Sequence, residues 1–116
     1  MSAAHAATCR VKVGDTFPAM TLPNASGNAQ DLNALRGPKL TVVVLWQAGN
    51  PYSVWELKRV GELVAMPLSD AGVSVVAINV GDPAELAKQT ASATTNNKVA
   101  QLLDEQRAGF EQLATG

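Results

Sequence analysis

The sequence has few of the residues that build redox and metal sites, with one cysteine, Cys9, and one histidine, His5. A single cysteine excludes an intramolecular disulfide, a dithiol redox couple and a thiolate-rich metal site within the chain. A single histidine, close to the start of the chain, leaves no histidine cluster and no histidine-based catalytic triad. We therefore expect neither a metal nor a cofactor.

Long apolar runs and runs of one charge are missing as well. No apolar stretch approaches the roughly 20 residues that a membrane-spanning helix needs. Nine Lys and Arg residues against ten Asp and Glu residues give a net charge of −1, without a basic stretch. This balance argues against nucleic acid or an anionic membrane as a partner. The 116 residues, 47% of them hydrophobic, suffice for one modest domain with a single core.

The first residues of the chain, MSAAHAATCR, are rich in alanine and show no periodicity. We expect a flexible arm over residues 1–10 and one domain over residues 11–116. An alternative is the remnant of a signal peptide that ends near Ala4-His5-Ala6. The residues before Cys9 make a poor lipid-attachment motif, so we expect an exposed thiol without a role.

One stretch organises the rest of the chain. Leu40 to Leu45 is a continuous apolar, β-branched run, typical of a parallel strand that is covered on both faces. Gln47 to Gly49 break the strand, and Asn50-Pro51 opens a helix, because Asn is a favoured N-cap and Pro suits the first helical position. Sites in α/β folds lie at the carboxyl ends of strands, so chemistry is expected between Trp46 and Glu56.

The remaining elements follow from periodicity and turn signals. Strand, helix and strand between residues 40 and 80 form a βαβ unit with parallel strands. Asp82 is the expected cap of the next helix, with Pro83 at its first position and Glu85 at its third. The expected elements are a hairpin of Met20–Leu22 and Ala29–Asp31, a turn capped by Asp31, helices Pro51–Met66, Pro83–Ala91 and Ala108–Ala114, a polar loop Ser92–Lys98, and strands Val73–Val80 and Val99–Leu103.

In the order and spacing of its motifs, the stretch VGDTFPAMTLPNASGNAQDLNALRGPKLTVVVLW resembles the opening of the thioredoxin-fold redoxins, the AhpC/TSA and TlpA-like group. The shared pattern is Gly-Asp, an aromatic residue with Pro, a hairpin with Gly, Leu-x-x-Leu-x-Gly and an apolar strand. The resemblance covers about residues 11 to 115. It implies an α/β, thioredoxin-like fold, with an N-terminal β-hairpin followed by a mostly parallel sheet and flanking helices.

The resemblance also locates the positions of the family's cysteines. Members follow the strand with Trp-Cys-x-x-Cys and then Glu, and alignment on Leu45-Trp46 and Glu56 places the two cysteines on Asn50 and Ser53. Alignment as a peroxiredoxin again places the peroxidatic cysteine on Ser53. Asn50 cannot ionise, and a serine hydroxyl is far too basic to replace a thiolate without a neighbouring base. We therefore interpret Asn50 and Ser53 as structural residues of a helix start.

The neighbours of these two positions receive roles in the same interpretation. Trp46 packs at the end of the strand, and Pro51 starts the helix. Glu56 occupies the family's acidic position but has no cysteine to serve. Tyr52 and Trp55 are candidates for a contact with another protein.

The resemblance further implies an incomplete domain. A thioredoxin-like domain continues with a cis-proline loop, a β-hairpin and a final helix, whereas this sequence stops at Gly116, about where that loop would begin. The hairpin normally pairs with the strand at residues 40–45, so we expect an exposed strand edge there, which invites association. The hypothesis is a truncated product or gene fragment.

Three functions compete at this point. The first is a redox-inactive domain that binds or supports another protein through the region from Trp46 to Trp55 or through the edge of strand 40–45. The second is a fragment of an active antioxidant oxidoreductase, or activity through Cys9. The third is a flavodoxin-like or nucleotide-binding domain whose turn at residues 47–50 binds a phosphate, although G-x-G-x-x-G and the P-loop are missing. The resemblance favours an extracytoplasmic location, periplasmic or anchored.

Overall fold

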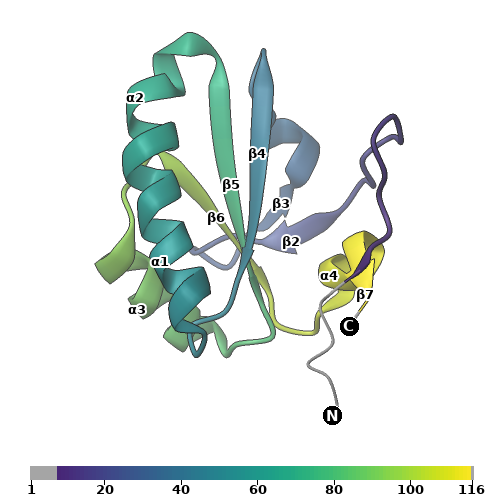
Figure 1. Cartoon of the computed structure of the whole chain (residues 1–116). Coiled ribbons are helices and arrows are strands. Elements are labelled where there is room, and N and C mark those ends of the chain that lie inside the picture. Colours follow the sequence, from purple (N-terminus) through teal and green to yellow (C-terminus); the bar gives the residue numbers. More distant parts are fainter. Residues whose placement is uncertain (1–7, 116) are drawn as a thin grey trace.

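Three parallel strands form the centre of the molecule (Figure 1). The computed structural model describes residues 8–115. The sheet order is β4 (Leu40–Trp46), β5 (Val73–Val80) and β6 (Val99–Asp104). All of these strands are apolar through most of their length, which suits strands with a covered face on both sides. The architecture confirms the predicted α/β, thioredoxin-like fold with a mostly parallel sheet.

Short helices and a hairpin surround the sheet. The hairpin pairs β2 (Thr21–Pro23) with β3 (Ala29–Asp31) in antiparallel register, as predicted. The Asp31 side chain accepts a hydrogen bond from the Asn33 amide and caps the turn that follows. The helical segments are η1 (Leu32–Leu35), α1 (Pro51–Val60), the π turn η2 (Gly61–Ala65), α2 (Met66–Leu68), η3 (Ser69–Ala71), α3 (Ala84–Thr94) and α4 (Ala108–Leu113).

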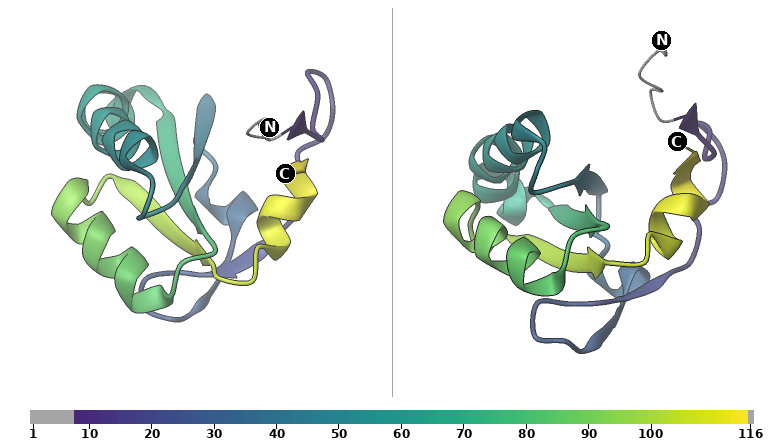
Figure 2. Two further views of the ribbon diagram at one scale, coloured as in Figure 1. Left: turned by 60° about the horizontal axis from the view of Figure 1, so that its bottom comes forward. Right: turned by 90° about the horizontal axis from the view of Figure 1, so that it is seen from below.

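Side chains alternate across β5 and form one core layer on each face of the sheet. Val76, Ile78 and Val80 pack on the side of the hairpin, η1 and α4. Val75 and Ala77 pack on the other side, against α1, η2 and α3. Figure 2 shows α1 and α3 together on one side of the sheet and α4 on the other. The β4–α1–β5 segment is the predicted βαβ unit, with Leu40 opposite Val73 and Trp46 opposite Asn79.

The helix that begins at Pro51 contains a π turn where it meets the residues that follow α3. The Met66 amide donates to the Gly61 carbonyl, and the Asn96 Nδ2 donates to the same oxygen at 3.0 Å. A Cβ on Gly61 would lie 2.4 Å from Thr95 Oγ1, so a larger residue at this position would require the Thr95 side chain to shift. The π turn precedes Pro67, which cannot donate to the helix ladder. Leu57 is fully buried, as the predicted apolar face requires.

The two ends of the described chain lie side by side. β1 (Thr8–Cys9) pairs antiparallel with β7 (Ala114–Thr115), and the Arg10 amide donates to the Leu113 carbonyl at 2.8 Å. Residues 8–10 of the segment predicted as a flexible arm are therefore held by backbone hydrogen bonds, which the sequence pattern did not indicate. The rest of that segment, with His5, lies outside the described residues.

Helix α3 differs from its prediction at both ends. Pro83, not Asp82, occupies the N-cap position, and no side chain caps the helix. The Asp82 carboxylate binds elsewhere, as described below. At the other end the helix continues through Thr94, where the Thr95 amide donates to the Ala91 carbonyl at 2.9 Å. The first residues of the predicted polar loop are therefore helical.

The two outer edges of the sheet are treated differently. On the outer side of β6, Asn24 from the hairpin turn forms a β-bridge with Leu102. On the outer side of β4, no strand pairs within residues 8–115. The predicted exposed edge at residues 40–45 is thus present in the described chain.

Candidate active-site turn

The turn from Gln47 to Asn50 joins the carboxyl end of β4 to the start of α1. Asn50 has an extended backbone, and its side-chain oxygen accepts hydrogen bonds from the amides of Tyr52 at 3.0 Å and Ser53 at 3.2 Å. These amides have no partner within the helix, because they belong to its first turn. Asn50 is therefore the N-cap that the sequence predicts.

Ser53 fastens the turn to the helix. Its Oγ accepts from the Gln47 amide at 3.0 Å and lies 2.8 Å from the Gln47 carbonyl, to which it donates. The Asn50 carbonyl is a second acceptor at 3.1 Å. Backbone groups thus surround the hydroxyl, and no base within the described residues contacts it. A serine in this environment lacks the adjacent general base that an activated nucleophile needs.

A third side chain reaches the turn from the end of β5. The Asp82 Oδ2 accepts from the Ala48 amide at 2.7 Å and from the Asn79 Nδ2 at 2.8 Å. A further hydrogen bond links the turn to the end of β5, because the Gln47 Nε2 donates to the Val80 carbonyl at 3.2 Å. Asn79 is 1% exposed, so the amide–carboxylate pair satisfies a polar group inside the core.

Sequence reasoning missed Asn79 and Asp82 as parts of this site. Asn79 is a polar residue near the carboxyl end of a strand that is apolar from Val75 to Ile78, and Asp82 follows that strand closely. Parallel strands end at the same edge of a sheet, so both lie next to the end of β4. The helix-start pattern of Asp-Pro-x-Glu concealed this signal, because it offered Asp82 a capping role.

The geometry of the turn disfavours the phosphate-binding alternative. Side chains of the protein already accept hydrogen bonds from the amides of Gln47, Ala48, Tyr52 and Ser53. The Asp82 carboxylate adds a negative charge beside the Ala48 amide, where an anion would have to bind. The turn is therefore closed to a phosphate.

The other predicted site residues divide into buried and exposed. Trp46 is 1% exposed and packs at the end of β4, as predicted, so it offers no surface to a partner. Glu56 is exposed and makes no hydrogen bond or ion pair with any residue that the structure describes. The Glu56 carboxylate therefore contacts no polar group of this turn.

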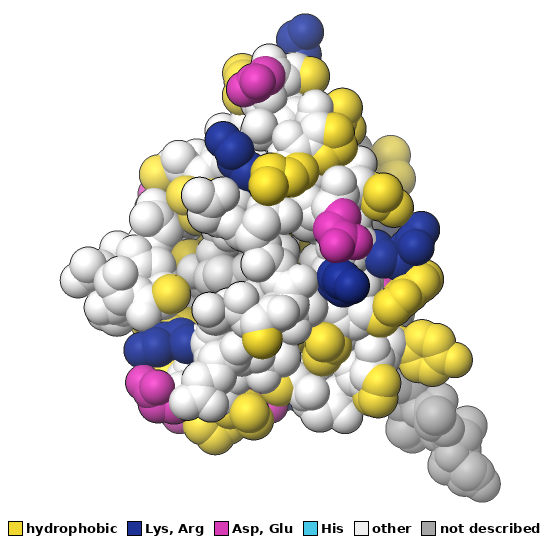
Figure 3. Space-filling view, turned by 90° about the vertical axis from the view of Figure 1, so that its left-hand side faces the viewer, with side chains coloured by type: hydrophobic (Ala, Val, Ile, Leu, Met, Phe, Trp, Pro, Cys, Tyr) yellow, Lys and Arg dark blue, Asp and Glu magenta, His cyan; other side chains and the backbone are white. Residues whose placement is uncertain are grey.

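Exposed aromatic side chains follow the turn on α1. Tyr52 is 82% exposed and Trp55 is 52% exposed, and with Pro51 they line a hollow of about 330 Å³. The Arg59 guanidinium lies over the Trp55 ring, 4.7 Å from its centroid, a cation–π geometry that holds the ring in place. The side of the molecule that carries α1 and α3 shows several such hydrophobic side chains between charged ones (Figure 3).

Cys9 lies away from this turn. It is exposed and belongs to β1, which pairs with β7 next to α4. Figures 1 and 2 place α4 and β7 on the opposite side of the molecule from the start of α1. The thiol and the Ser53 hydroxyl therefore do not form one site.

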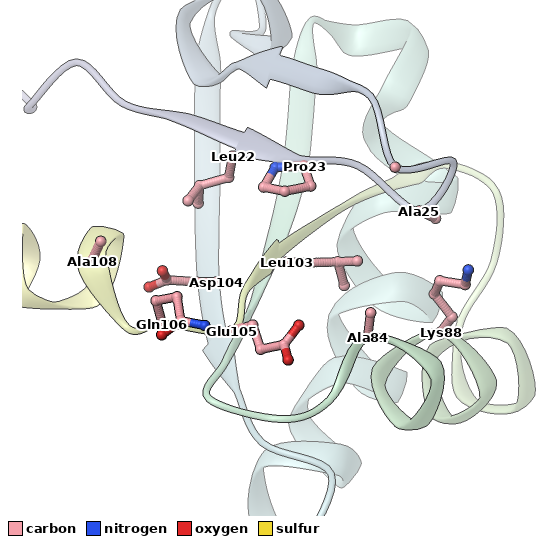
Figure 4. Close-up of a pocket in the computed structure, with 11 residues that line it drawn as sticks. Leu22, Pro23, Ala25, Ala84, Lys88, Leu103, Asp104, Glu105, Gln106 and Ala108 are labelled. Carbon is pink, nitrogen blue, oxygen red and sulfur yellow. The ribbon is translucent and has the colours of Figure 1, made fainter.

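A second hollow, of about 400 Å³, lies between the hairpin, the start of α3 and the turn after β6 (Figure 4). Two of its polar side chains have partners: Asp104 accepts from the amides of Gly109 and Phe110 at 3.1 and 2.7 Å, and Lys88 pairs with Glu85 at 3.1 Å. None of its lining residues comes from the β4–α1 turn. Over residues 8–115 there is no cluster of metal-ligating side chains. No helix in that range has the length and hydropathy to cross a membrane.

Comparison with solved structures supports the fold. The thioredoxin domain of a thiol-disulfide oxidoreductase from Bacteroides vulgatus superposes with a TM-score of 0.73 at 19% identity, covering 88% of this chain and 73% of that one. A secreted disulfide oxidoreductase of Mycobacterium tuberculosis gives 0.66 at 19% identity, covering 80% and 66%. The peroxidoxin BcpB of the same organism gives 0.71 at 27% identity, covering 89% and 66%.

The chain thus spans about two thirds to three quarters of the length of these structures. No curated protein sequence matches it. The sequence profile of the AhpC/TSA family matches residues 13–115, which include the hairpin, the whole sheet and the closed turn. The chain therefore belongs to the AhpC/TSA family.

Proposed function

We propose that this thioredoxin-like domain is redox-inactive and serves as a binding module for a segment of another protein. The observation that carries the proposal is that the polar side chains of the β4–α1 turn bond to the backbone of the protein itself. Asn50 and Ser53 stand where the resemblance places the family's cysteines, and both side chains are taken up by backbone groups of the helix start. Thiol–disulfide and peroxide chemistry need a thiolate at that position.

The exposed aromatic pair beside the turn supplies the binding surface. Tyr52 and Trp55 bring large area at a low cost in side-chain entropy, and such residues dominate binding energy in protein interfaces. The Arg59 guanidinium over Trp55 pre-organises the ring. A hollow of about 330 Å³ bounded by Pro51 and the two rings accepts one side chain of a partner.

Redox silence is tested with matched variants in insulin-disulfide reduction and peroxide consumption. The unmodified chain and Cys9→Ser are expected to show no turnover above buffer. Asn50→Cys/Ser53→Cys in the Cys9→Ser background asks whether the frame still supports a dithiol. Turnover by the unmodified chain that Cys9→Ser abolishes would instead support activity through Cys9, whose exposure makes that alternative worth testing.

Binding is tested by selecting extended peptides from a display library on the domain. Selected peptides are expected to lose about 10-fold or more of their affinity for Tyr52→Ala/Trp55→Ala, since truncated hot spots cost about 2 kcal/mol. Leu63→Ala/Met66→Ala is the matched control, because these residues are 57% and 51% exposed on the same helical segment. Equal losses in both variants, or none in the first, contradict a site at Tyr52 and Trp55.

A further inference from the structure

We propose that the outer face of the helical segment over residues 51–68 packs antiparallel against the same face of a second copy of this chain, which gives a dimer. The proposal rests on the proposed function in that the second copy covers the exposed aromatic pair assigned there to the binding of other proteins. The surface is an apolar stripe of exposed side chains on that segment: Tyr52, Trp55, Leu63 and Met66.

The apolar stripe lies on the side of the helix that faces away from the sheet. Leu57 and Ala65 pack against β5 and α3, and Gly61, halfway between them, is buried as well. Trp55 precedes Leu57 by two residues and Leu63 precedes Ala65 by two, which is about half a helical turn, so both project from the opposite side. The exposure of the stripe therefore does not depend on the unpaired edge of β4.

Four large apolar side chains are unusual on the outer face of a surface helix, which is normally polar. Tyr52 is 82% exposed, and the three others are between 51% and 57% exposed. The Arg59 guanidinium covers one face of the Trp55 ring and still leaves half of that side chain in water. Figure 3 shows hydrophobic side chains on this side of the molecule with charged ones between them. Grouped exposed apolar side chains mark an interaction surface.

Charges beside the apolar stripe favour a second copy, in antiparallel orientation. Lys58 and Arg59 are followed within about one turn by Glu62, and none of the three has an ion-pair partner among residues 8–115. An antiparallel pair whose twofold axis crosses the helix just after Val60 brings the two cations next to Glu62 of the second copy, and the twofold repeats this contact. A parallel pair would set like charges opposite each other. Exposed ion pairs of this kind fix orientation and register more than affinity.

The same register fills the hollow at the start of α1. It sets Met66 of one copy beside Trp55 of the other, at the hollow of about 330 Å³ that Pro51, Tyr52 and Trp55 line. A methionine side chain is flexible, and its thioether makes favourable contacts with aromatic rings. Each copy supplies one methionine and receives one, so the contact is isologous and closes as a dimer.

The dimer regulates access to the aromatic pair. Its contact is only one helix wide, which places it at the small end of specific interfaces, below about 1,200 Å² of buried area. We therefore expect a weak dimer that exchanges with the monomer. A segment of another protein must displace Met66 of the second copy before it reaches the hollow, so its apparent affinity falls as the concentration of the chain rises.

The test is sedimentation velocity from micromolar to millimolar concentration, with a reducing agent present so that Cys9 cannot link two copies. We expect a monomer–dimer equilibrium. Met66→Lys should weaken the dimer at least tenfold, whereas Leu86→Lys on α3 should leave it unchanged, since Met66 and Leu86 are 51% and 45% exposed. Leu63→Lys repeats the test if Met66→Lys does not fold. A monomer at every concentration, or a dimer that only Leu86→Lys disrupts, overturns the proposal.

Charge reversal tests which residues meet across the twofold axis. Lys58→Glu/Arg59→Glu and Glu62→Lys should each weaken self-association, because like charges then meet in both homodimers, and a mixture of the two variants should associate at least tenfold more tightly than either alone. A mixture that associates no better overturns this register.

The dimer and the proposed function can fail separately. A chain that stays monomeric and binds selected peptides through Tyr52 and Trp55 overturns the dimer and leaves the proposed function in place. A dimer that Met66→Lys disrupts, in a chain for which no peptide is selected, supports the dimer and contradicts the proposed function.

Discussion

At its carboxyl end β4 runs into a turn whose amides are taken up by Asn50, Ser53 and Asp82. Along its outer side the same strand presents amides that no described segment takes up. The closed end is the place where the fold usually carries chemistry, and here its polar groups serve the backbone. The binding surface that we propose is therefore the exposed aromatic pair beside the turn, Tyr52 and Trp55, and not the end of the strand.

The largest effect is expected from a proline substitution in β4, and it should depend on which of two neighbouring residues is replaced. The Leu40 amide donates to the Gly72 carbonyl, just before β5. Alternate residues of a parallel strand bond to the same neighbour, so Val44 faces β5 and Val43 faces outward. Val44→Pro removes an amide that donates to β5 and should destabilise the domain by about 3 kcal/mol or more. Val43→Pro removes an outward amide, as edge strands tolerate, and should cost about 1 kcal/mol for the lost apolar contacts of a half-buried valine. Urea unfolding measures both, and equal losses would show that the edge is not open.

The second largest loss of stability is expected when the Asp82 carboxylate is removed from the turn at the end of β4. Asp82→Ala leaves the Ala48 amide and the buried Asn79 side chain without an acceptor, so the free energy of unfolding should fall by about 2–3 kcal/mol. Asp70→Ala is the control, because Asp70 is exposed and its loss should cost less than about 0.5 kcal/mol. If the two variants are equally stable, Asp82 does not hold the turn.

A smaller loss of stability is expected when the N-cap of α1, Asn50, is replaced. Asn50→Ala should lower the free energy of unfolding by about 1 kcal/mol, because the amides of Tyr52 and Ser53 lose their acceptor. Asn50→Asp keeps the acceptor and places a negative charge at the helix start, which is favourable. Thermal unfolding should therefore rank Asp at or above Asn and both above Ala. A different order would remove Asn50 from its capping role.

The smallest effect is expected at the aromatic pair. Tyr52→Ala and Trp55→Ala remove largely exposed side chains, so each should change the free energy of unfolding by less than about 1 kcal/mol, the loss at Trp55 including its contact with Arg59. Chemical denaturation followed by circular dichroism measures this. A loss of several kcal/mol at either position would mean that the ring supports the fold rather than a partner.

Much of the fold was readable from local patterns. The apolar runs at residues 40–45 and 73–80 gave both strands of the βαβ unit, and the Asn50-Pro51 pair gave the helix start. The pairing of β1 with β7 was not readable, because Thr8-Cys9 and Ala114-Thr115 are too short to show a period and lie at opposite ends of the chain. Long-range pairing of such segments depends on tertiary contacts that sequence spacing does not encode.

The site was predicted in part. The roles of Asn50 as a cap and of Trp46 as a packed residue followed from their positions, and the structure confirms both. Asp82 was misassigned because its local pattern fits an N-cap, whereas the amide of Ala48 across the sheet edge competes for the same carboxylate. Local capping signals lose to tertiary hydrogen bonds where two strand ends meet.

The central claim is that the β4–α1 turn is structural and not redox-active. The most direct measurement is the rate of peroxide consumption and insulin-disulfide reduction by the unmodified chain with excess dithiothreitol, beside Cys9→Ser and buffer. The account predicts three equal rates in each assay. A rate for the unmodified chain clearly above that of buffer would contradict it.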